Sequence, residues 1–379
     1  MYIPRLLEDK IIRQIKTSHK IIVIYGPRQV GKTTLSKKIL DYIDIPARTI
    51  NSDIPEYQKI FEKLDINELQ LLPGNSKILF IDEAHQLANI GKALKILYDE
   101  LPELKIIATG SSSFDLSSKI TEPLTGRKFE YMLFPFLLKE LDNFFSYDTV
   151  QLKSIVNQIL IYGTYPEVFL AQDLEEKANI LSEVAQSYLF KDILSLTGIK
   201  YPQKLKDLTM FLAFHIGQPV SINELCDTLS LNHDTVEHYL DLLQKTFVIF
   251  KLPVFSSRFR NVLKKKSKYY FYDLGIRNAI ISRFTNINLR DDTGQLWENF
   301  VIAEKIKSAK TLNTHAQFYY WRTYDGAEID LIEVKNEQIS AYEIKLKKYK
   351  KNPPKSWQNI IKTYTFNTIN MDNFHIYIL

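Results

Sequence analysis

"IIVIYGPRQVGKTTL", residues 21–35, decides the fold of the first part of this chain. An apolar run of strand type leads into "GPRQVGKT", residues 26–33, and a helical pattern follows from Thr33. The segment matches G-x-x-x-x-G-K-[ST], and a strand before it with a helix behind it is the context that this pattern requires. Gly26 and Gly31 let the loop wrap so that backbone N–H groups face a phosphate, and the helix start adds a partial positive charge. The stretch therefore predicts a phosphate-binding loop.

The residue types of this loop point to ATP held together with Mg²⁺. Lys32 is expected to reach the β- and γ-phosphates, and the Thr33 hydroxyl is expected to ligate Mg²⁺. ATP and Mg²⁺ are therefore the expected cofactors. The residues expected to contact the nucleotide are Gly26, Pro27, Arg28, Gln29, Val30, Gly31, Lys32, Thr33 and Thr34.

A second segment, "KILFIDEAH" (77–85), supplies two acids at the end of a strand. The apolar residues 78–81 predict a fully buried strand. Asp82, at its carboxyl end, is expected to hold Mg²⁺ through its water shell. Glu83 is placed to polarise an attacking water as general base. "DEAH" also spells a helicase box, but the sequence shows no partner motifs for it, so His85 is interpreted as the start of a helix.

Three further polar positions are candidates for the same site. The strand "LKIIATG" (104–110) carries Thr109, which would lie between the other two strand ends and contact the γ-phosphate or orient the water. Ser111 is the alternative, although a serine-rich turn can be only a turn. Arg127, in "PLTGRKF", is a candidate arginine finger for a neighbouring subunit, and a surface arginine is the alternative. Whether the chain forms a homo-oligomer stays open.

Composition excludes some classes of protein. The chain has 379 residues, of which 45% are hydrophobic and 25% charged, as in ordinary globular proteins. No apolar run approaches the roughly 20 residues that cross a bilayer, and the charged N-terminus lacks the apolar core of a secretory signal. Cys226 is the one cysteine, which excludes an internal disulfide. These features predict a cytoplasmic protein with no membrane partner.

Basic residues are concentrated in two runs, although the net charge is only +5. "RFRNVLKKKSK" (258–268) and "KLKKYKKNPPK" (345–355) contain no acid. Such runs form either solvated surfaces or contacts with an anionic partner such as DNA.

"SINELCDTLSLNHDTVEHYLDLLQKT" (221–246) resembles a helix-turn-helix, with Asn232 as the N-cap of the second helix. The strands "FVIFKLP" and "KYYFYD" would form a wing with the basic run 258–268 at its tip. The second helix exposes Asp234, Glu237 and Asp241, which repel phosphate and suit base reading poorly. The region is therefore expected to contact DNA without sequence preference or to dock a protein partner.

"EIDLIEVKNEQISAYEIK" (328–345) predicts a β-hairpin with a tight turn at Asn336–Glu337. In that register Asp330 faces Glu343 and Glu328 faces Lys345, and strand alternation puts all four on one face. Two facing carboxylates repel each other unless a cation lies between them, so Mg²⁺ or Mn²⁺ is expected there.

The order of motifs resembles a known family. The phosphate loop, "ILFIDEAH", "ATGSSS" and "LTGRKFEYMLFPFLLKEL" are similar to the AAA-type ATPases of bacteria and archaea that carry a C-terminal domain of unknown function. "YGTYPEV", "SKYYFYDLGIRNAI" and "YYWRTYDGAEIDLIE" extend the likeness over nearly the whole chain, although Thr164 stands where this family usually has a second glycine. The resemblance implies an architecture more than a purpose.

Within the hairpin, Asp330 and the pair Glu343-x-Lys345 resemble the PD-(D/E)xK nucleases, with Glu298 on the preceding helix as a fourth member. The resemblance implies metal binding by the three acids and a Lys345 that positions or activates a water. The alternative is a nuclease-like scaffold in which Lys345 only pairs with the acids.

Together these observations predict an α/β fold: a P-loop NTPase parallel sheet, then a helical and winged-helix region, then a small α/β restriction-endonuclease-like domain. The predicted domains are an ATPase core (1–132), a helical extension (133–200), a winged-helix-like domain (201–290) and a nuclease-like domain (291–379). Three functions fit: an ATP-dependent DNA-processing enzyme, an ATPase switch for protein or DNA partners with an inert nuclease-like end, and a DNA-binding regulator that only senses ATP. Glu83 disfavours the third, since a sensor needs no general base.

Overall fold

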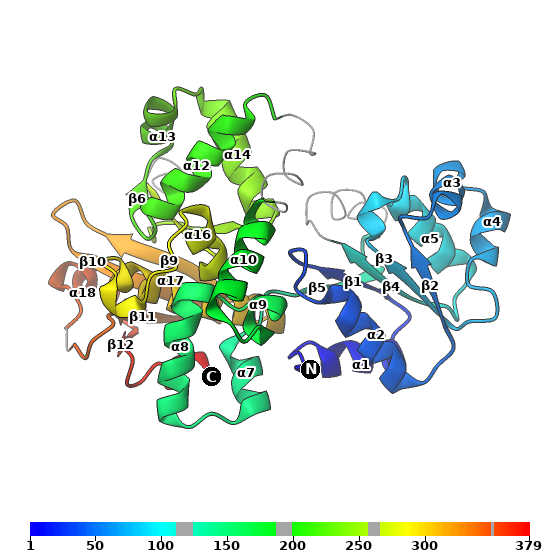
Figure 1. The fold of residues 1–379 in the computed structure, drawn as a ribbon, viewed down its shortest axis with the longest axis horizontal. Helices are drawn as coiled ribbons and strands as arrows, with labels where there is room; N and C mark the ends of the chain where they lie inside the picture. Colours follow the sequence, from blue (N-terminus) through cyan, green and yellow to red (C-terminus); the bar gives the residue numbers. More distant parts are fainter. Residues whose placement is uncertain (111–123, 187–198, 257–265, 350–351) are drawn as a thin grey trace. The chain divides into compact units, whose positions relative to one another are not determined.

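The computed structural model describes residues 1–110, 124–186, 199–256, 266–349 and 352–379 (Figure 1). This described part of the chain forms two compact units. The N-terminal unit contains residues 2–135 with 245–247, and the C-terminal unit contains residues 136–244 and 248–379 with Met1. Among the described residues, no helix is both long enough and apolar enough to cross a bilayer.

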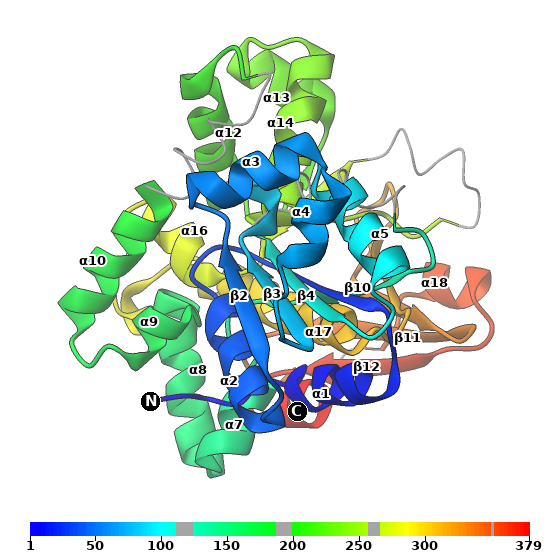
Figure 2. The ribbon, with the colours of Figure 1, turned by 90° about the vertical axis from the view of Figure 1, so that its right-hand side faces the viewer.

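The N-terminal unit is built on a five-stranded parallel sheet in the order β2-β3-β4-β1-β5. Figure 2 shows β2, β3 and β4 side by side. All five positions of β1 are buried, as expected for a strand covered by helices on both faces. β4 lies between β1 and β3, which confirms the prediction that the strand carrying Thr109 ends between the other two strand ends. The strands are β1 (Ile21–Tyr25), β2 (Ala47–Asn51), β3 (Ile78–Asp82), β4 (Lys105–Gly110) and β5 (Lys128–Met132).

Helices cover both faces of this sheet. The crossover from β1 to β2 passes through α2, and the crossovers towards β3 and β4 run in the opposite direction across the sheet, so their helices lie on the other face. The predicted parallel α/β sheet is thereby confirmed. The helices are α1 (Glu8–Thr17), α2 (Lys32–Ile43), α3 (Pro55–Lys63), α4 (Ile66–Leu71) and α5 (Ile90–Glu100), with a single 3₁₀ turn, η1 (Ala84–Gln86).

The helix expected after "ILFID" begins later than the sequence indicated. Glu83 has φ +52° and Asn89 has φ +53°, and neither conformation can continue a right-handed helix. Between them lies only η1, so α5 starts at Ile90. His85 therefore belongs to a short turn beside Glu83, and the interpretation of His85 as the start of a helix was wrong.

The C-terminal unit begins with helices. Asp148 caps α8 by accepting from Val150 N and Gln151 N, and Asn232 caps α14 by accepting from Thr235 N at 2.8 Å, as predicted. The described helices up to residue 290 are α7 (Leu138–Phe145), α8 (Thr149–Tyr162), α9 (Pro166–Leu170), α10 (Leu174–Val184), α12 (Pro202–Phe214), α13 (Ile222–Leu229), α14 (His233–Lys245), α16 (Leu274–Ile280) and the 3₁₀ turn η3 (Ile287–Leu289).

A small antiparallel sheet accompanies α12, α13 and α14. Its order is β6-β8-β7, formed by β6 (Pro219–Val220), β7 (Ile249–Leu252) and β8 (Ser267–Phe271). β8 is buried at every position although it carries Ser267 and Lys268. A lysine in a buried strand needs a partner, which bears on the second site below.

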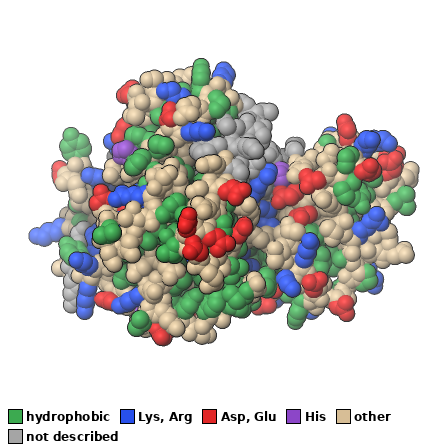
Figure 3. All heavy atoms as spheres, viewed as in Figure 1, with side chains coloured by type: hydrophobic (Ala, Val, Ile, Leu, Met, Phe, Trp, Pro, Cys, Tyr) green, Lys and Arg blue, Asp and Glu red, His purple; other side chains and the backbone are tan. Residues whose placement is uncertain are grey.

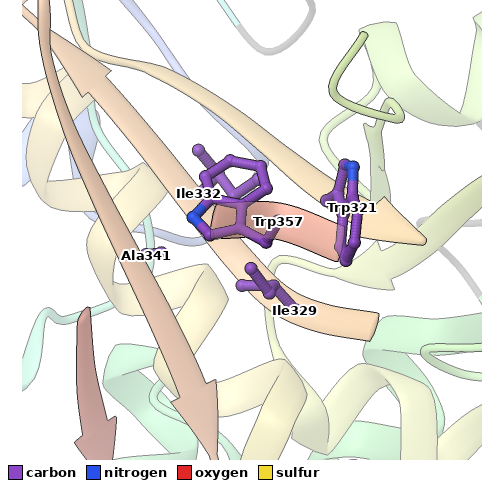
Figure 4. Close-up of a cluster of buried hydrophobic side chains, with 5 residues drawn as sticks. All are labelled: Trp321, Ile329, Ile332, Ala341 and Trp357. Carbon is purple, nitrogen blue, oxygen red and sulfur yellow. The ribbon is translucent and has the colours of Figure 1, made fainter. Parts of the chain in front are cut away.

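The last part of the chain is a mixed four-stranded sheet in the order β12-β11-β10-β9. The rings of Trp321 and Trp357 lie 5.4 Å apart at 70° in its core cluster, together with Ile329, Ile332 and Ala341 (Figure 4). The elements are α17 (Thr293–Leu312), β9 (Gln317–Arg322), β10 (Glu328–Lys335), β11 (Gln338–Ile344), α18 (Lys355–Ile360), β12 (Thr365–Ile369) and α19 (His375–Ile378).

The predicted hairpin register is confirmed near the turn. Leu331 pairs with Tyr342 and Lys335 pairs with Gln338. Asn336 and Glu337 have φ +49° and +64°, the two positive values of a type I′ turn. Further out, the pairing of β10 with β9 shifts by one residue between Ile329 and Ile332, which marks a bulge. The bulge brings these two residues into one core cluster, although strict alternation would separate them.

Candidate functional site

The loop between β1 and α2 owes its shape to its glycines. A Cβ on Gly26 would lie 2.0 Å from the Leu133 carbonyl oxygen, so no larger residue fits. Leu133 is held there because its N–H donates to the Tyr25 carbonyl at 2.8 Å. Gly31 caps α2 with φ +91°, which glycine adopts without penalty. The backbone thus fixes the turn that the sequence predicted between β1 and α2.

Lys32 lies inside this loop and is only 4% exposed. Its Nζ donates to the carbonyls of Gly26 (3.1 Å) and Pro27 (2.8 Å). Burial lowers the pKa of Lys32 to about 8, against the opposing charges of Glu83 and Asp82. A phosphate beside this ammonium would add negative charge and favour the protonated form.

Two threonines converge on Asp82 at the carboxyl end of β3. Thr33 Oγ1 lies 2.9 Å from both carboxylate oxygens, and Thr109 Oγ1 donates to Oδ1 at 2.6 Å. Thr109 Oγ1 also accepts from the Glu83 N–H at 3.1 Å. The three elements α2, β3 and β4 therefore bring together Thr33, Asp82 and Thr109. Carboxylate and hydroxyl oxygens are the hard ligands that Mg²⁺ prefers, so this donor set fits Mg²⁺.

The hydroxyl of Thr109 engages the two acids, so in this structure it orients Asp82 and the Glu83 backbone. The direct contact of Thr109 with γ-phosphate or water stays a prediction. Ser111, the alternative, lies outside the described residues.

Glu83 has a partner that the sequence did not indicate. His85 Nδ1 lies 3.2 Å from Glu83 Oε2. Burial raises the pKa of Glu83, but the contact with His85 and the charges of Lys32 and Arg28 outweigh it, so the pKa lies below its ordinary value. The carboxylate is thus ionised at neutral pH, as a general base must be. The left-handed conformation of Glu83 and the tight turn after it bring these two side chains together. No pattern in the sequence predicts this turn.

Arg127 is not brought together with the loop. The parallel pairing of β1 with β5 matches Ile21 to Lys128, which places Arg127 at the amino end of the sheet, away from residues 26–33. Its Nε lies 3.1 Å from Asp99 Oδ1, and its guanidinium lies over the Tyr98 ring. A finger role in a neighbouring subunit stays a prediction.

A second acidic centre lies at the outer end of the β10–β11 hairpin. Lys345 Nζ lies 3.0 Å from Asp330 Oδ2 and 3.1 Å from Glu343 Oε1. The Ile344 N–H also donates to Asp330 Oδ2 at 2.8 Å. Burial lowers the pKa of Lys345, but the two carboxylates outweigh it and raise the pKa above its ordinary value. Lys345 of the predicted D…ExK set therefore contacts both acids.

Glu298, the expected fourth ligand, is bound by another lysine. Lys268 Nζ lies 3.0 Å from Glu298 Oε1 and 2.6 Å from Glu328 Oε1, and the Tyr270 hydroxyl donates to Glu298 Oε1 at 2.5 Å. Burial raises the pKa of Glu298, and the charge of Lys268 opposes this shift. Within the described ranges, no group of three or more His, Cys, Asp or Glu residues could hold a metal ion. Ammonium groups thus lie where the sequence led us to expect a metal.

The expected pairing of Glu328 with Lys345 was wrong. Glu328 contacts Lys268 at 2.6 Å and Arg322 at 3.4 Å, and Lys345 contacts Asp330 and Glu343. The bulge in β10 is the physical reason, because it breaks the alternation on which the prediction relied.

The basic runs are only partly consistent with a DNA-binding surface. Lys268 is 2% exposed and paired, and Lys266 lies 3.0 Å from Glu224, so the described end of the first run is not free for phosphate. Residues 258–265 lie outside the described residues. In the second run Lys347 and Lys348 are exposed, directly after the acidic centre.

Acidic side chains occupy other surfaces of the C-terminal unit. Asp234 and Glu237 are exposed on α14, as expected from the sequence. A further group gathers over α9 and α10 on the face drawn in Figure 3. These surfaces would repel a phosphate backbone. The exposed acids are Glu167 on α9, Asp173 at the N-cap of α10, and Glu175, Glu176 and Glu183 on α10.

Comparison with known proteins shows what each part of the chain is similar to. Residues 18–142 match the family model of an AAA domain. That match supports nucleotide binding by the loop 26–33. Residues 153–287 and 293–370 each match a domain of unknown function, so the nuclease resemblance stays a prediction.

Similar proteins are found in bacteria and archaea. An uncharacterized protein of Haemophilus influenzae is 28% identical over 347 residues, covering 86% of this chain and 82% of that protein. An uncharacterized protein of Methanocaldococcus jannaschii is 27% identical over 385 residues, covering 92% and 82%. The solved structure of a Walker-type ATPase of Pyrococcus abyssi covers 74% of this chain and 96% of that chain, with a TM-score of 0.50 at 18% identity. The N-terminal unit of this chain thus has the P-loop NTPase fold.

Proposed function

We propose that this protein is a Mg²⁺-dependent ATPase whose AAA domain hydrolyses ATP to drive a conformational switch. One observation carries the proposal: Thr33 Oγ1 lies 2.9 Å from Asp82, beside the buried Lys32, at the carboxyl ends of parallel strands. In open α/β sheets ligands bind at this edge. The AAA domain match supports the same assignment.

Each side chain then has a role. Lys32 and the loop N–H groups bind the phosphates, while Thr33 and Asp82 hold Mg²⁺. Mg²⁺ when bound neutralises charge on the β- and γ-phosphate oxygens. Glu83 accepts a proton from water as the water oxygen attacks the γ-phosphorus, and the bond to the β–γ bridging oxygen breaks to release ADP and phosphate. Thr109 keeps both acids in place through its hydrogen bonds.

Phosphate release in the full-length chain tests this function. Lys32→Ala is expected to reduce Mg²⁺-dependent turnover by at least about a hundredfold, and Glu83→Gln by about 10² to 10³ while ATP binding persists. Lys37→Ala, an exposed lysine on the same helix, is the matched control and should leave turnover unchanged. Full turnover in Lys32→Ala would refute the site.

A second activity, metal-dependent cleavage of DNA, is favoured by one specific observation. Lys345 lies 3.0 Å from Asp330 and 3.1 Å from Glu343, so one lysine joins the two acids of the D…ExK set. Exposed Lys347 and Lys348 follow directly, where they could hold a phosphate backbone. We propose a site for one Mg²⁺ or Mn²⁺ on Asp330 and Glu343, with Lys345 moving aside to position a water.

A cleavage screen over duplex, single-stranded and branched DNA with Mn²⁺, with and without ATP, tests this activity. Glu343→Ala and Lys345→Ala should each abolish cleavage and leave ATP hydrolysis intact. Lys335→Ala, an exposed lysine on the same hairpin, is the control. If cleavage persists in both variants, another site or a contaminant is responsible. If the wild type cuts nothing, the ATPase switch with an inert nuclease-like scaffold is the better description.

DNA is the partner that we propose for the C-terminal unit, held by Lys347 and Lys348 without base reading. The order α12, α13, α14, β7 and β8 supports a winged-helix arrangement, but the acids Asp234 and Glu237 disfavour α14 as a reader of bases. A protein partner is the alternative for this surface. The cytoplasmic location, the homo-oligomer and the four domain boundaries remain predictions.

A further inference from the structure

The DEAH tetrapeptide contains a histidine that the proposed reaction does not yet use. His85 Nδ1 lies 3.2 Å from Glu83 Oε2, with side-chain exposures of 11% for His85 and 31% for Glu83. The contact is therefore shielded on the histidine side and open on the carboxylate side. A carboxylate that faces both a fixed donor and solvent has one oxygen oriented and the other accessible.

The backbone explains why these two side chains meet. Glu83 adopts φ +52°, and its N–H is tied to Thr109 Oγ1 at 3.1 Å. The Gln86 N–H donates to the Glu83 carbonyl at 3.0 Å and closes the turn η1 around Ala84. The general base thus sits at a left-handed position of a kind that is often retained for function, and the turn behind it delivers His85.

The charges around Glu83 are consistent with its role as a base. Lys32 and Arg28 stabilise its ionised form, so the carboxylate carries a negative charge while it contacts His85. The histidine contacts one carboxylate oxygen, Oε2, and can thereby restrict rotation of the carboxylate. Catalytic bases are commonly oriented by such a third group.

We propose that His85 is a positioning residue that fixes the carboxylate of Glu83, through the close contact of Nδ1 with Oε2, in line with the attacking water. His85 takes no proton from the water; Glu83 does. This inference rests on the proposed function, because it assigns a role within ATP hydrolysis.

Steady-state ATP hydrolysis by the full-length protein tests the inference. His85→Ala is expected to lower kcat about tenfold with KM for ATP within twofold, because a loosened base affects the chemical step and not the binding of ATP. His85→Asn places an amide N–H near the position of Nδ1 and should retain kcat within about threefold of the wild type. His233→Ala, an exposed histidine on α14, is the control and should change neither constant.

A double variant separates positioning from a structural role. If His85 acts only through Glu83, then His85→Ala added to Glu83→Gln should cause no further loss of kcat. Fluorescent-ATP binding by each variant shows that the site is folded. An additive double variant, a rise in KM with unchanged kcat, or an Asn variant as slow as the Ala variant would each overturn the inference. Absence of Lys32-dependent turnover in the wild type would overturn the proposed function as well, so the two failures are distinguishable.

Discussion

The two acidic centres of this protein differ in what holds their carboxylates. At the end of β3, the hydroxyls of Thr33 and Thr109 donate hydrogen bonds to Asp82. These hydroxyls are neutral, so they do not compensate the negative charge of the carboxylate. In the β10–β11 region, ammonium groups of Lys268 and Lys345 contact the acids directly. A hydroxyl can stay in place when a cation binds, whereas an ammonium must move or be displaced. The first centre is therefore ready for Mg²⁺, and the second is already neutralised from within.

The lysines of the two centres show the same difference. Burial lowers the pKa of Lys32 to about 8, since its nearest acceptors are neutral carbonyls. At Lys268 and Lys345 burial acts in the same direction, but the neighbouring carboxylates outweigh it and raise the pKa. Lys32 thus donates to neutral acceptors, whereas Lys268 and Lys345 are paired with carboxylates.

The largest expected effect is on ATP hydrolysis, which should depend on the first acidic centre and not on the second. Asp82→Asn should lower Mg²⁺-dependent ATP hydrolysis about a thousandfold or more, because metal charge stabilisation amounts to several kcal/mol. Asp330→Asn should leave the rate of ATP hydrolysis within twofold of the wild type. Phosphate release measures both variants. Comparable losses in the two would show that the centres are not independent, and the comparison would fail.

Next in size is the loss of the buried ammonium. Lys268→Met should lower the unfolding free energy by about 3 kcal/mol, because it leaves the largely buried Glu298 without its cation, whereas Glu328 keeps Arg322. Urea unfolding followed by tryptophan fluorescence measures it, since Trp297, Trp321 and Trp357 all lie in α17 or beyond. Adding Glu298→Gln and Glu328→Gln should recover part of the loss. A Lys268→Met protein as stable as the wild type would contradict the buried ion pair.

Ligand binding should stabilise the first centre. At a concentration of 100 Kd, MgADP should add about 2.7 kcal/mol to the unfolding free energy of the N-terminal unit. EDTA should remove most of this gain, and Lys32→Ala should abolish it. Hydrogen exchange of β1 and β3 reports this unit directly. If amides of β10 and β11 were protected instead, the nucleotide would bind at the second acidic centre, and the assignment would be wrong.

The smallest expected effect is the loss of stability when Lys345, an exposed lysine, is replaced. Lys345 is 42% exposed, so Lys345→Met should cost only about 1 kcal/mol, since water can replace the ammonium. Because its pKa is raised in the folded state, its contribution is fully present below about pH 10.4 and is lost as the pH rises through the folded pKa. Urea unfolding of wild type and variant at about pH 7 and about pH 11 tests the sign. A difference that grows with pH would show that the lysine is not paired as described.

Local patterns accounted for much of the fold. The loop 26–33, the strand ending in Asp82 and the hairpin turn at Asn336–Glu337 were all predicted, because each depends on residues adjacent in the chain. The position of β4 between β1 and β3 followed from the motif order and is confirmed. The bulge in β10 was missed, because it depends on the pairing with β9 and leaves no mark in the alternation of β10 itself.

The sequence by itself determined the phosphate loop and the register of the hairpin near its turn, since glycine positions and strand alternation act over a few residues. The tertiary structure alone decided which cation each acid meets. Lys268 reaches Glu298 across 30 positions of the chain, and a left-handed Glu83 turns His85 back onto the base. Burial makes these contacts strong, and burial depends on how distant segments pack, which no short stretch of sequence encodes.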